Sequence, residues 1–163
     1  MCYLNVNVTG LNGRVHPALT GVTDTQGVPK IRAHLKMLCN DLYTYKRKSD
    51  YQGGSPHCRL CQEGIEDLDH IIAQCSAYRD VRDRILDEIE KICSESNSLI
   101  NFEEIKKTQK HLTQFILDCS SLNLPSRFNI YDENIYKMFR ISREFCYYVK
   151  KTRSERLKSI SAV

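Results

Sequence analysis

The sequence lacks the motifs of several common enzyme classes. A polymerase needs aspartates for two metal ions, typically an adjacent Asp-Asp pair, and the chain contains no such pair. A restriction-like nuclease needs a Pro-Asp before a Glu-x-Lys, and only the second half is present, at Glu104 and Lys106. There is also no glycine-rich phosphate loop and no Gly-x-Ser-x-Gly motif. We therefore expect a protein that is not an enzyme and has no small-molecule substrate.

Long apolar runs and a secretory start are also absent. No stretch of the 163 residues approaches the roughly 20 apolar residues of a membrane-spanning helix. Residues 1–8 carry no basic start followed by an apolar run, so they do not resemble a secretory signal. These absences predict an intracellular protein, nuclear or cytoplasmic, that has no membrane partner. The apolar content of 41% is ordinary for a globular chain of this length.

Cysteine is abundant, with eight residues, and three of them form a pattern with a histidine. Cys58, Cys61, His70 and Cys75 follow the spacing C-x2-C-x8-H-x4-C. Three thiolates and one imidazole complete the tetrahedral ligand set of a structural zinc ion, with no position left for water. The first pair can bind from one tight turn, and Gly64 lies in a polar segment that lets the chain fold back. The spacing predicts one structural Zn²⁺.

Three other interpretations of the cysteines remain open: a chance cluster, a disulfide framework and a redox C-x-x-C motif. Disulfides require an oxidising compartment, which the missing secretory signal argues against. A redox motif is expected at a strand-to-helix turn, and no parallel strands are indicated. Cys2 has no assignment. The remaining cysteines fall on or beside apolar helix faces and are expected to be small buried residues: Cys39, Cys93, Cys119 and Cys146.

The residues around the predicted ligands resemble a known family. The shared features are the four ligands, an acidic residue before the histidine, two isoleucines after it and an arginine beyond the last cysteine. In this chain they are Cys58-x2-Cys61, Glu66-x3-His70-Ile71-Ile72, Cys75-Ser76-Ala77-Tyr78 and Arg82. The pattern resembles the cysteine–histidine (CCHC) zinc segment at the C-terminal end of non-LTR retrotransposon reverse transcriptases.

The resemblance extends upstream and covers residues 28–85. Residues 28–45 are similar to the basic, leucine-spaced helix that those proteins place just before the zinc segment. Family members often have proline after the first ligand cysteine and glycine after the second, where this chain has Arg59 and Gln62. The resemblance implies a non-catalytic nucleic-acid-binding segment, either a fragment or a domesticated remnant of such a reverse transcriptase.

Apolar spacing predicts an all-α fold, with four main helices and one short helix at a zinc knuckle that lies between them. The clearest helix covers residues 28–45, where apolar residues recur at steps of three and four. A short helix is expected over residues 68–74, so that His70 lies within it and Cys75 just past its end. The stripe of the first helix consists of Val28, Ile31, Leu35, Leu38, Leu42 and Tyr45.

Three more long helices are expected after the metal ligands. The first covers residues 78–92 and is capped by Ser76. The second is one continuous helix from a cap at Asn101 to Cys119. The third follows a cap at Asp132 and has a basic end. Its expected core face consists of Ile135, Met138, Phe139, Phe145, Cys146 and Val149.

The net charge of +4 is unevenly distributed along the chain. Residues 1–57 have seven basic and three acidic side chains, residues 58–104 have five and twelve, and residues 105–163 have twelve and five. Zinc does not reverse the acidic centre, because three thiolates and one dication together carry a charge of −1. We therefore expect the two basic flanks, and not the metal segment, to bind a polyanion.

The flanks contain the candidate nucleic-acid-binding residues. Lysine and arginine neutralise phosphates, and tyrosine stacks on bases. Cations near a helix C-terminus also favour the helix dipole, which is an alternative explanation for some of them. The candidate from the knuckle turn is Arg59. The others are Tyr43, Tyr45, Lys46, Arg47, Lys48, Lys150, Lys151, Arg153, Arg156 and Lys158.

These patterns divide the chain into three regions. Residues 1–27 are expected to be a flexible leader, residues 28–94 a basic helix with the zinc knuckle, and residues 95–163 a helical region with a basic end. The first functional hypothesis is binding of RNA or DNA, and the alternative is a zinc-stapled protein–protein interaction domain. Salt-dependent affinity for nucleic acid would favour the first, and a stable complex with protein would favour the second.

Overall fold

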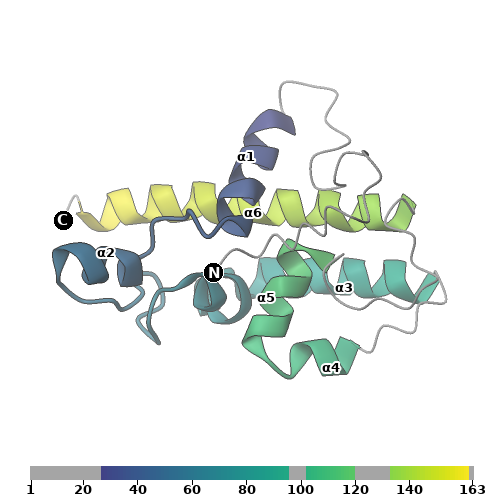
Figure 1. The fold of residues 1–163 in the computed structure, drawn as a ribbon, viewed down its shortest axis with the longest axis horizontal. Helices are drawn as coiled ribbons and strands as arrows, with labels where there is room; N and C mark the ends of the chain where they lie inside the picture. The colour runs from purple at the N-terminus through teal and green to yellow at the C-terminus, as the bar shows by residue number, and fades with distance from the viewer. Residues whose placement is uncertain (1–26, 96–101, 120–132, 162–163) are drawn as a thin grey trace.

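The computed structural model describes residues 27–95, 102–119 and 133–161, and the regular elements in these segments are helical (Figure 1). An isolated antiparallel bridge between His57 and Ile65 is the only extended pairing there. The predicted all-α fold is confirmed. The elements are α1 (Gly27–Leu38), α2 (Tyr45–Gln52), a π-helical turn (His70–Gln74), a 3-10 turn (Ser76–Tyr78), α3 (Arg79–Glu95), α4 (Phe102–Lys106), α5 (Gln109–Leu117) and α6 (Glu133–Ser161).

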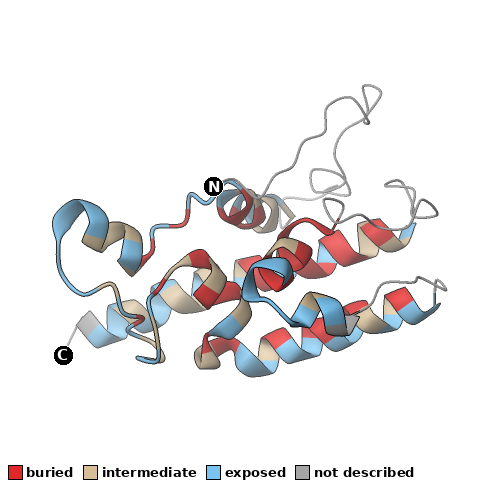
Figure 2. Ribbon diagram, turned by 60° about the horizontal axis from the view of Figure 1, so that its bottom comes forward, coloured by how far each residue is buried: buried red, intermediate tan, exposed pale blue. Residues whose placement is uncertain are grey.

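The longest helix, α6, runs through the molecule and contacts helices from both halves of the sequence (Figure 1). Helix α1 crosses it and α3 lies along it, and these are its two most extensive contacts. Buried positions lie where these helices meet, whereas α2 has no buried residue (Figure 2). Within the described segments, no helix is both long enough and apolar enough to cross a lipid bilayer. Residues before and after position 95 therefore share one core around α6.

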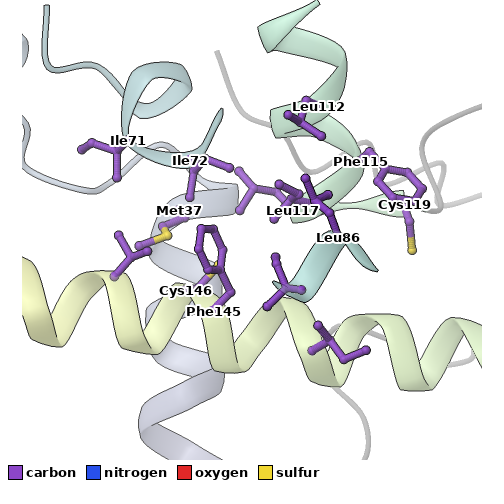
Figure 3. Close-up of a cluster of buried hydrophobic side chains, with 14 of the residues drawn as sticks. Met37, Ile71, Ile72, Leu86, Leu112, Phe115, Leu117, Cys119, Phe145 and Cys146 are labelled. Atoms are coloured by element: carbon purple, nitrogen blue, oxygen red, sulfur yellow. The ribbon is translucent and has the colours of Figure 1, made fainter. Parts of the chain in front are cut away.

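The predicted core faces of the two longest helices are confirmed. On α6 the six predicted residues, from Ile135 to Val149, are all buried. The side chains of Phe145 and Cys146 point from α6 toward Met37 and the π-helical turn that carries Ile71 and Ile72 (Figure 3). On the predicted helix over residues 78–92, three residues of the stripe are fully buried and two pack against the core at partial exposure. The buried ones are Tyr78, Ile85 and Ile89, and the partly exposed ones are Val81 and Ile92.

The predicted single helix over residues 28–45 is wrong, because α1 ends at Leu38. Asn40 adopts a left-handed conformation with φ of 51°. Its N–H donates to the Met37 carbonyl at 2.9 Å, and the Asp41 N–H donates to the Lys36 carbonyl at 2.6 Å. This pair of hydrogen bonds is a Schellman motif, which satisfies the last carbonyls of a helix. The polar residues Asn40 and Asp41 thus stop the helix although the apolar spacing continues past them.

A new helix begins after this connection. The side chain of Thr44 accepts a hydrogen bond from the Arg47 N–H at 3.2 Å, so Thr44 is the N-cap of α2. Lys46, Arg47 and Lys48 therefore belong to α2 and not to the end of α1. Leu42 is buried from the connection itself. The basic run consequently lies on a short, separately oriented helix.

The buried face of α1 also differs from the predicted stripe. Val28 is 57% exposed, and Ile31 and Leu35 are only partly buried. The face that packs against the core consists of Ala33, His34, Met37 and Leu38. Cys39 follows this face by one residue and is exposed, so its predicted burial is wrong. Cys93, Cys119 and Cys146 are buried as predicted.

Two further helix predictions need correction. The continuous helix over residues 101–119 is two helices, because Thr108 is extended and its side chain caps α5 by accepting from the His111 N–H. Ser76 does not cap α3; it is the first residue of the 3-10 turn, which has no side-chain cap. Of the predicted leader over residues 1–27, Gly27 is instead the first residue of α1, and residues 1–26 lie outside the described residues. The predicted caps Asn101 and Asp132 and the unassigned Cys2 lie outside them as well.

Buried polar side chains connect the end of α5 to α1 and α6. The Nε2 atom of His34 lies 2.7 Å from the Leu117 carbonyl oxygen, and Ser142 donates its hydroxyl to the Ile116 carbonyl. Both carbonyls belong to the last turn of a helix, where no backbone N–H of the same helix is available. His34 and Ser142 supply these donors from separate helices. The two contacts thus specify how α1, α5 and α6 fit together.

The corrected face of α1 leads to a first prediction. Met37→Ala removes a fully buried side chain and should lower the free energy of unfolding by about 2–5 kcal/mol. Val28→Ala changes an exposed side chain and should alter it by less than about 0.5 kcal/mol. Urea denaturation of the two variants measures both values. If Val28→Ala lowered the free energy of unfolding more than Met37→Ala, the buried face of α1 would instead be the one predicted from apolar spacing.

Candidate functional site

The four predicted metal ligands come together in space. The ligand atoms of Cys58, Cys61, His70 and Cys75 all lie within 4.8 Å of one another. The sulfurs of Cys58 and Cys75 are 3.9 Å apart, and the Cys61 sulfur is 3.2 Å from Nε2 of His70. Zinc–sulfur bonds of about 2.3 Å place two sulfurs of a tetrahedron about 3.8 Å apart. The described geometry is therefore compatible with one structural zinc ion.

A short reverse turn places the first two ligands. The Cys58 N–H donates to the Gly64 carbonyl at 2.8 Å, and the Gln62 N–H donates to the Cys58 carbonyl at 2.9 Å. Gln62 has φ of 63°, a left-handed conformation that costs a residue with a side chain about 1–2 kcal/mol. The resembled family often has glycine at this position, which adopts this conformation without the cost. The turn is thus formed in spite of the side chain of Gln62.

The short helix predicted over residues 68–74 is present and positions the second pair. The His70 N–H donates to Oδ1 of Asp67 at 2.8 Å, which anchors the first turn. The Cys75 N–H donates to the His70 carbonyl at 2.7 Å, a π-type bond between residues five apart. Cys75 itself has φ of −51° and ψ of 119°, outside the helix. Both ligands thus reach the same point, as the spacing predicted.

Crowding of the thiols perturbs their protonation. The contact with Cys75 lowers the pKa of Cys58, and the same contact raises the pKa of Cys75. The Cys58 sulfur also raises the pKa of His70 by accepting from it. Without a cation, repulsion between two adjacent sulfurs disfavours ionisation of both, so only one of them is readily a thiolate. A bound dication removes this conflict, so metal binding should release protons.

A buried carboxylate connects the knuckle to two helices. The side chain of Glu66 is 0% exposed, and its Oε1 accepts from the Tyr45 N–H at 2.8 Å and from Nη2 of Arg153 at 2.5 Å. The Lys46 N–H donates to the Glu66 carbonyl at 3.1 Å. Burial raises the pKa of Glu66, and Arg153 opposes this by favouring the charged form. Glu66 thus binds α2 and α6 to the segment that carries the metal ligands.

A second buried polar contact supports the last ligand. Nη1 of Arg82 donates to the Cys75 carbonyl at 3.1 Å, and burial lowers the pKa of this guanidinium. Sequence patterns marked Glu66 and Arg82 only through the family resemblance, without a structural role. No periodicity could have paired Glu66 with Arg153, because 87 positions separate them. Glu66 and Arg82 therefore stabilise the knuckle through buried polar contacts.

A groove of about 620 Å³ lies between the α1–α2 connection and the C-terminal half of α6. The residues from α6 recur at steps of three and four, so they share one helix face. We call this concave surface the α6 groove. Its residues are Lys36, Asp41, Leu42 and Tyr43 on one side and Lys150, Arg153, Ser154, Leu157 and Lys158 on the other.

The α6 groove brings together four of the predicted nucleic-acid-binding residues: Tyr43, Lys150, Arg153 and Lys158. The groove also contains Lys36, which is not among the nucleic-acid-binding residues predicted from the sequence. The acid in the groove, Asp41, lies 3.6 Å from Nη1 of Arg47 and is partly neutralised. The groove surface is therefore net positive.

The other predicted binding residues lie elsewhere. Lys46 lies 3.7 Å from Asp67, and Arg47 lies 3.6 Å from Asp41. Lys151 is exposed and does not line the α6 groove. Arg156 donates to the Ala77 carbonyl at 3.4 Å. Of the basic residues near the end of α6, Lys150, Arg153 and Lys158 therefore line the α6 groove, whereas Lys151 and Arg156 lie outside it.

Tyr45 is surrounded by cations. Its ring centroid lies 4.8 Å from the guanidinium carbon of Arg59, 5.8 Å from that of Arg153 and 5.9 Å from Nζ of Lys48. Such cation–π contacts form within about 6 Å of a ring centroid. The Tyr45 ring therefore holds the knuckle turn against α2 and α6.

Comparison with known proteins found no relative of this site. No protein-family model, no curated protein and no solved structure matches the chain. The resemblance of residues 28–85 to the zinc segment of non-LTR reverse transcriptases stays a prediction. The ligand cluster and the α6 groove are the observations from which a function can be inferred.

The ligand cluster leads to a prediction about metal content. The purified protein should contain one zinc per chain, with X-ray absorption distances of about 2.3 Å to sulfur and about 2.0–2.1 Å to nitrogen. Cys75→Ser should lose the metal and expose residues 58–76 to hydrogen exchange, because metal binding is coupled to local folding. Zinc affinity should fall as pH is lowered, since protons compete for the thiolates. Native mass spectrometry measures the metal content.

The matched control is Cys39→Ser, which changes an exposed cysteine outside the cluster. This variant should keep its zinc and its exchange protection. A full equivalent of zinc in Cys75→Ser would reject the proposed ligand set.

The buried ion pair leads to a prediction about stability. Arg153→Met leaves the Glu66 carboxylate buried without its cation and should lower the free energy of unfolding by about 3–5 kcal/mol. Adding Glu66→Gln to Arg153→Met should recover much of this loss, because no unpaired charge remains. Lys137→Met breaks an exposed pair with Glu133 and should cost only about 0.5 kcal/mol. Urea denaturation of the zinc-loaded single and double variants measures these free energies of unfolding. The prediction is contradicted if the losses caused by Arg153→Met and Glu66→Gln simply add in the double variant.

Proposed function

We propose that this chain is a non-catalytic, zinc-stabilised nucleic-acid-binding segment, similar to the C-terminal part of a non-LTR retrotransposon reverse transcriptase. Cys58, Cys61, His70 and Cys75 would bind one zinc ion and leave no open coordination position, so the ion would be structural. Such a segment would act in the nucleus or the cytoplasm. The observation that carries the proposal is the cationic α6 groove.

The charges of the α6 groove support a polyanionic ligand. Lys36, Lys150 and Lys158 form no ion pair with another described residue. Lys36 comes from α1, whereas the other two come from a helix more than 100 residues later in the chain. Scattered surface lysines are common, but here separate helices direct them to one concave surface. Phosphates bound in that groove would release condensed counterions and make the affinity depend on salt.

The proposal predicts a change in salt dependence. Each phosphate contact contributes about −0.9 to the log–log salt slope on duplex DNA and about −0.7 on a single strand. Replacing Lys36, Lys150 and Lys158 together by glutamine should therefore flatten the slope by about two to three units. Replacing Lys46, Arg47 and Lys48 should flatten it less, because two of them already pair with acids. Fluorescence anisotropy across a salt series measures the slopes.

A triple variant with the same charge change provides the control. Replacing Lys91, Lys110 and Arg140 by glutamine removes three exposed cations, from α3, α5 and the N-terminal half of α6, that lie outside the α6 groove and form no ion pair with another described residue. This variant should keep a slope close to that of the parent protein, and both triple variants should keep their zinc. Equal flattening in both would mean that net charge, and not the groove, governs binding.

The second candidate function is a zinc-stapled protein-interaction domain, which the exposed face of α1 favours. Val28, which is 57% exposed, lines a shallow cleft of about 360 Å³ on α1 together with the partly buried Ile31 and Leu35. Exposed apolar surface of this kind is typical of a protein contact. Indifference to RNA and DNA, together with a stable complex that Val28→Asp disrupts in sedimentation velocity, would favour this function over nucleic-acid binding.

A further inference from the structure

The α6 groove contains an exposed aromatic ring among its cations. Tyr43 is 49% exposed and lines the groove beside Leu42 and Leu157. Leu42 is buried, so the chain is anchored directly before the tyrosine. A ring at an anchored position, open to solvent and flanked by lysines, can stack on a base while the lysines contact phosphates.

The neighbouring tyrosine cannot serve the same purpose. The Tyr45 ring is already in contact with Arg59, Arg153 and Lys48, at centroid distances between 4.8 and 5.9 Å. A base stacking on this ring would have to compete with those cations. Sequence spacing did not distinguish Tyr43 from Tyr45 as a stacking residue, whereas the structure favours Tyr43.

We infer that the α6 groove binds single-stranded nucleic acid, with a base stacked on Tyr43 and the flanking phosphates on Lys36, Lys150 and Lys158. The inference rests on the proposed function and specifies its ligand. A duplex keeps its bases paired and stacked inside the helix, so it offers phosphates to the lysines but no base face to the ring. Single strands of RNA and DNA both offer free base faces, and the ring is expected to accept either.

The test compares single strands with duplex. The probes are a fluorescent 12-nucleotide oligo(dT), a matching oligo(rU) and a 12-base-pair DNA duplex, measured by anisotropy at one fixed salt concentration. Base–aromatic stacking contributes about 1–3 kcal/mol per base, so Tyr43→Ala should weaken single-strand binding by about 5-fold to about 140-fold. Duplex affinity and the salt slope should stay close to those of the parent protein.

Two further variants separate stacking from other effects. Tyr43→Phe keeps the ring and should bind single strands like the parent protein. Tyr51→Ala removes a tyrosine that is 78% exposed and lies outside the α6 groove, and it should also leave binding unchanged. A loss of single-strand affinity in Tyr43→Ala alone, on oligo(dT), oligo(rU) or both, would support the inference and show which sugar the groove accepts.

The outcomes distinguish failure of this inference from failure of the proposed function. If the parent protein binds single strands and the groove lysines determine its salt slope, but Tyr43→Ala has no effect, stacking is rejected and nucleic-acid binding stands. An equal loss on duplex and single strand in Tyr43→Ala also rejects stacking. If the parent protein binds none of the three probes, both conclusions are overturned.

Discussion

Three cysteine thiolates cannot share the small space around Cys58, Cys61 and Cys75 unless a cation lies between them. Their ligand atoms and that of His70 lie within 4.8 Å, so repulsion between the sulfurs opposes the described geometry when they are ionised. A dication converts this repulsion into attraction and makes the loop rigid. The segment between α2 and α3 is attached to the helices by buried side chains, among them Leu68, Ile71, Ile72 and Tyr78. Its conformation therefore depends on the ligand cluster and on the contacts that attach the cluster to the helices.

Glu66 extends this constraint to the rest of the molecule. Its carboxylate is buried beside the ligand segment and accepts hydrogen bonds from the start of α2 and from Arg153 on α6. An unpaired buried carboxylate is costly, so the partners must stay in place whenever the knuckle is folded. Arg153 also lines the α6 groove. The metal segment and the groove are thereby linked through one side chain, although the segment itself is acidic and is not expected to bind phosphates.

The two tyrosines beside the basic run illustrate how position decides the role of a residue type. Tyr43 follows a buried leucine in the α1–α2 connection and lines the α6 groove, whereas Tyr45 begins α2 and lies within 6 Å of three cations. Cation–π contacts with the Tyr45 ring hold the knuckle turn against the helices. The ring of Tyr43 remains available to a ligand. Two similar side chains thus lie in different surroundings, one packed among cations and the other exposed in the groove.

Much of the fold and of the metal site could be predicted from the sequence alone. The ligand spacing identified Cys58, Cys61, His70 and Cys75, and apolar periodicity identified the core faces of α3 and α6, because these features depend on residues within a few turns of one another. The same periodicity misplaced α1. Asn40 ends one helix and Thr44 caps the next, and these local signals outweigh the apolar spacing. Leu42 fits the spacing of a helix because it is buried, but it is buried from the connection between the two helices.

The rest was decided by tertiary structure. Periodicity states which residues of a segment are apolar, but it does not state which distant segments meet. Glu66 meets Arg153 across 87 positions, His34 reaches the end of α5 across 83, and the α6 groove joins residues 36–43 to residues 150–158. These pairings arise because α6 packs across α1 and α3 and carries its basic end to the knuckle. The candidate metal ligands can therefore be identified from the local sequence, whereas the groove forms only when the helices pack together.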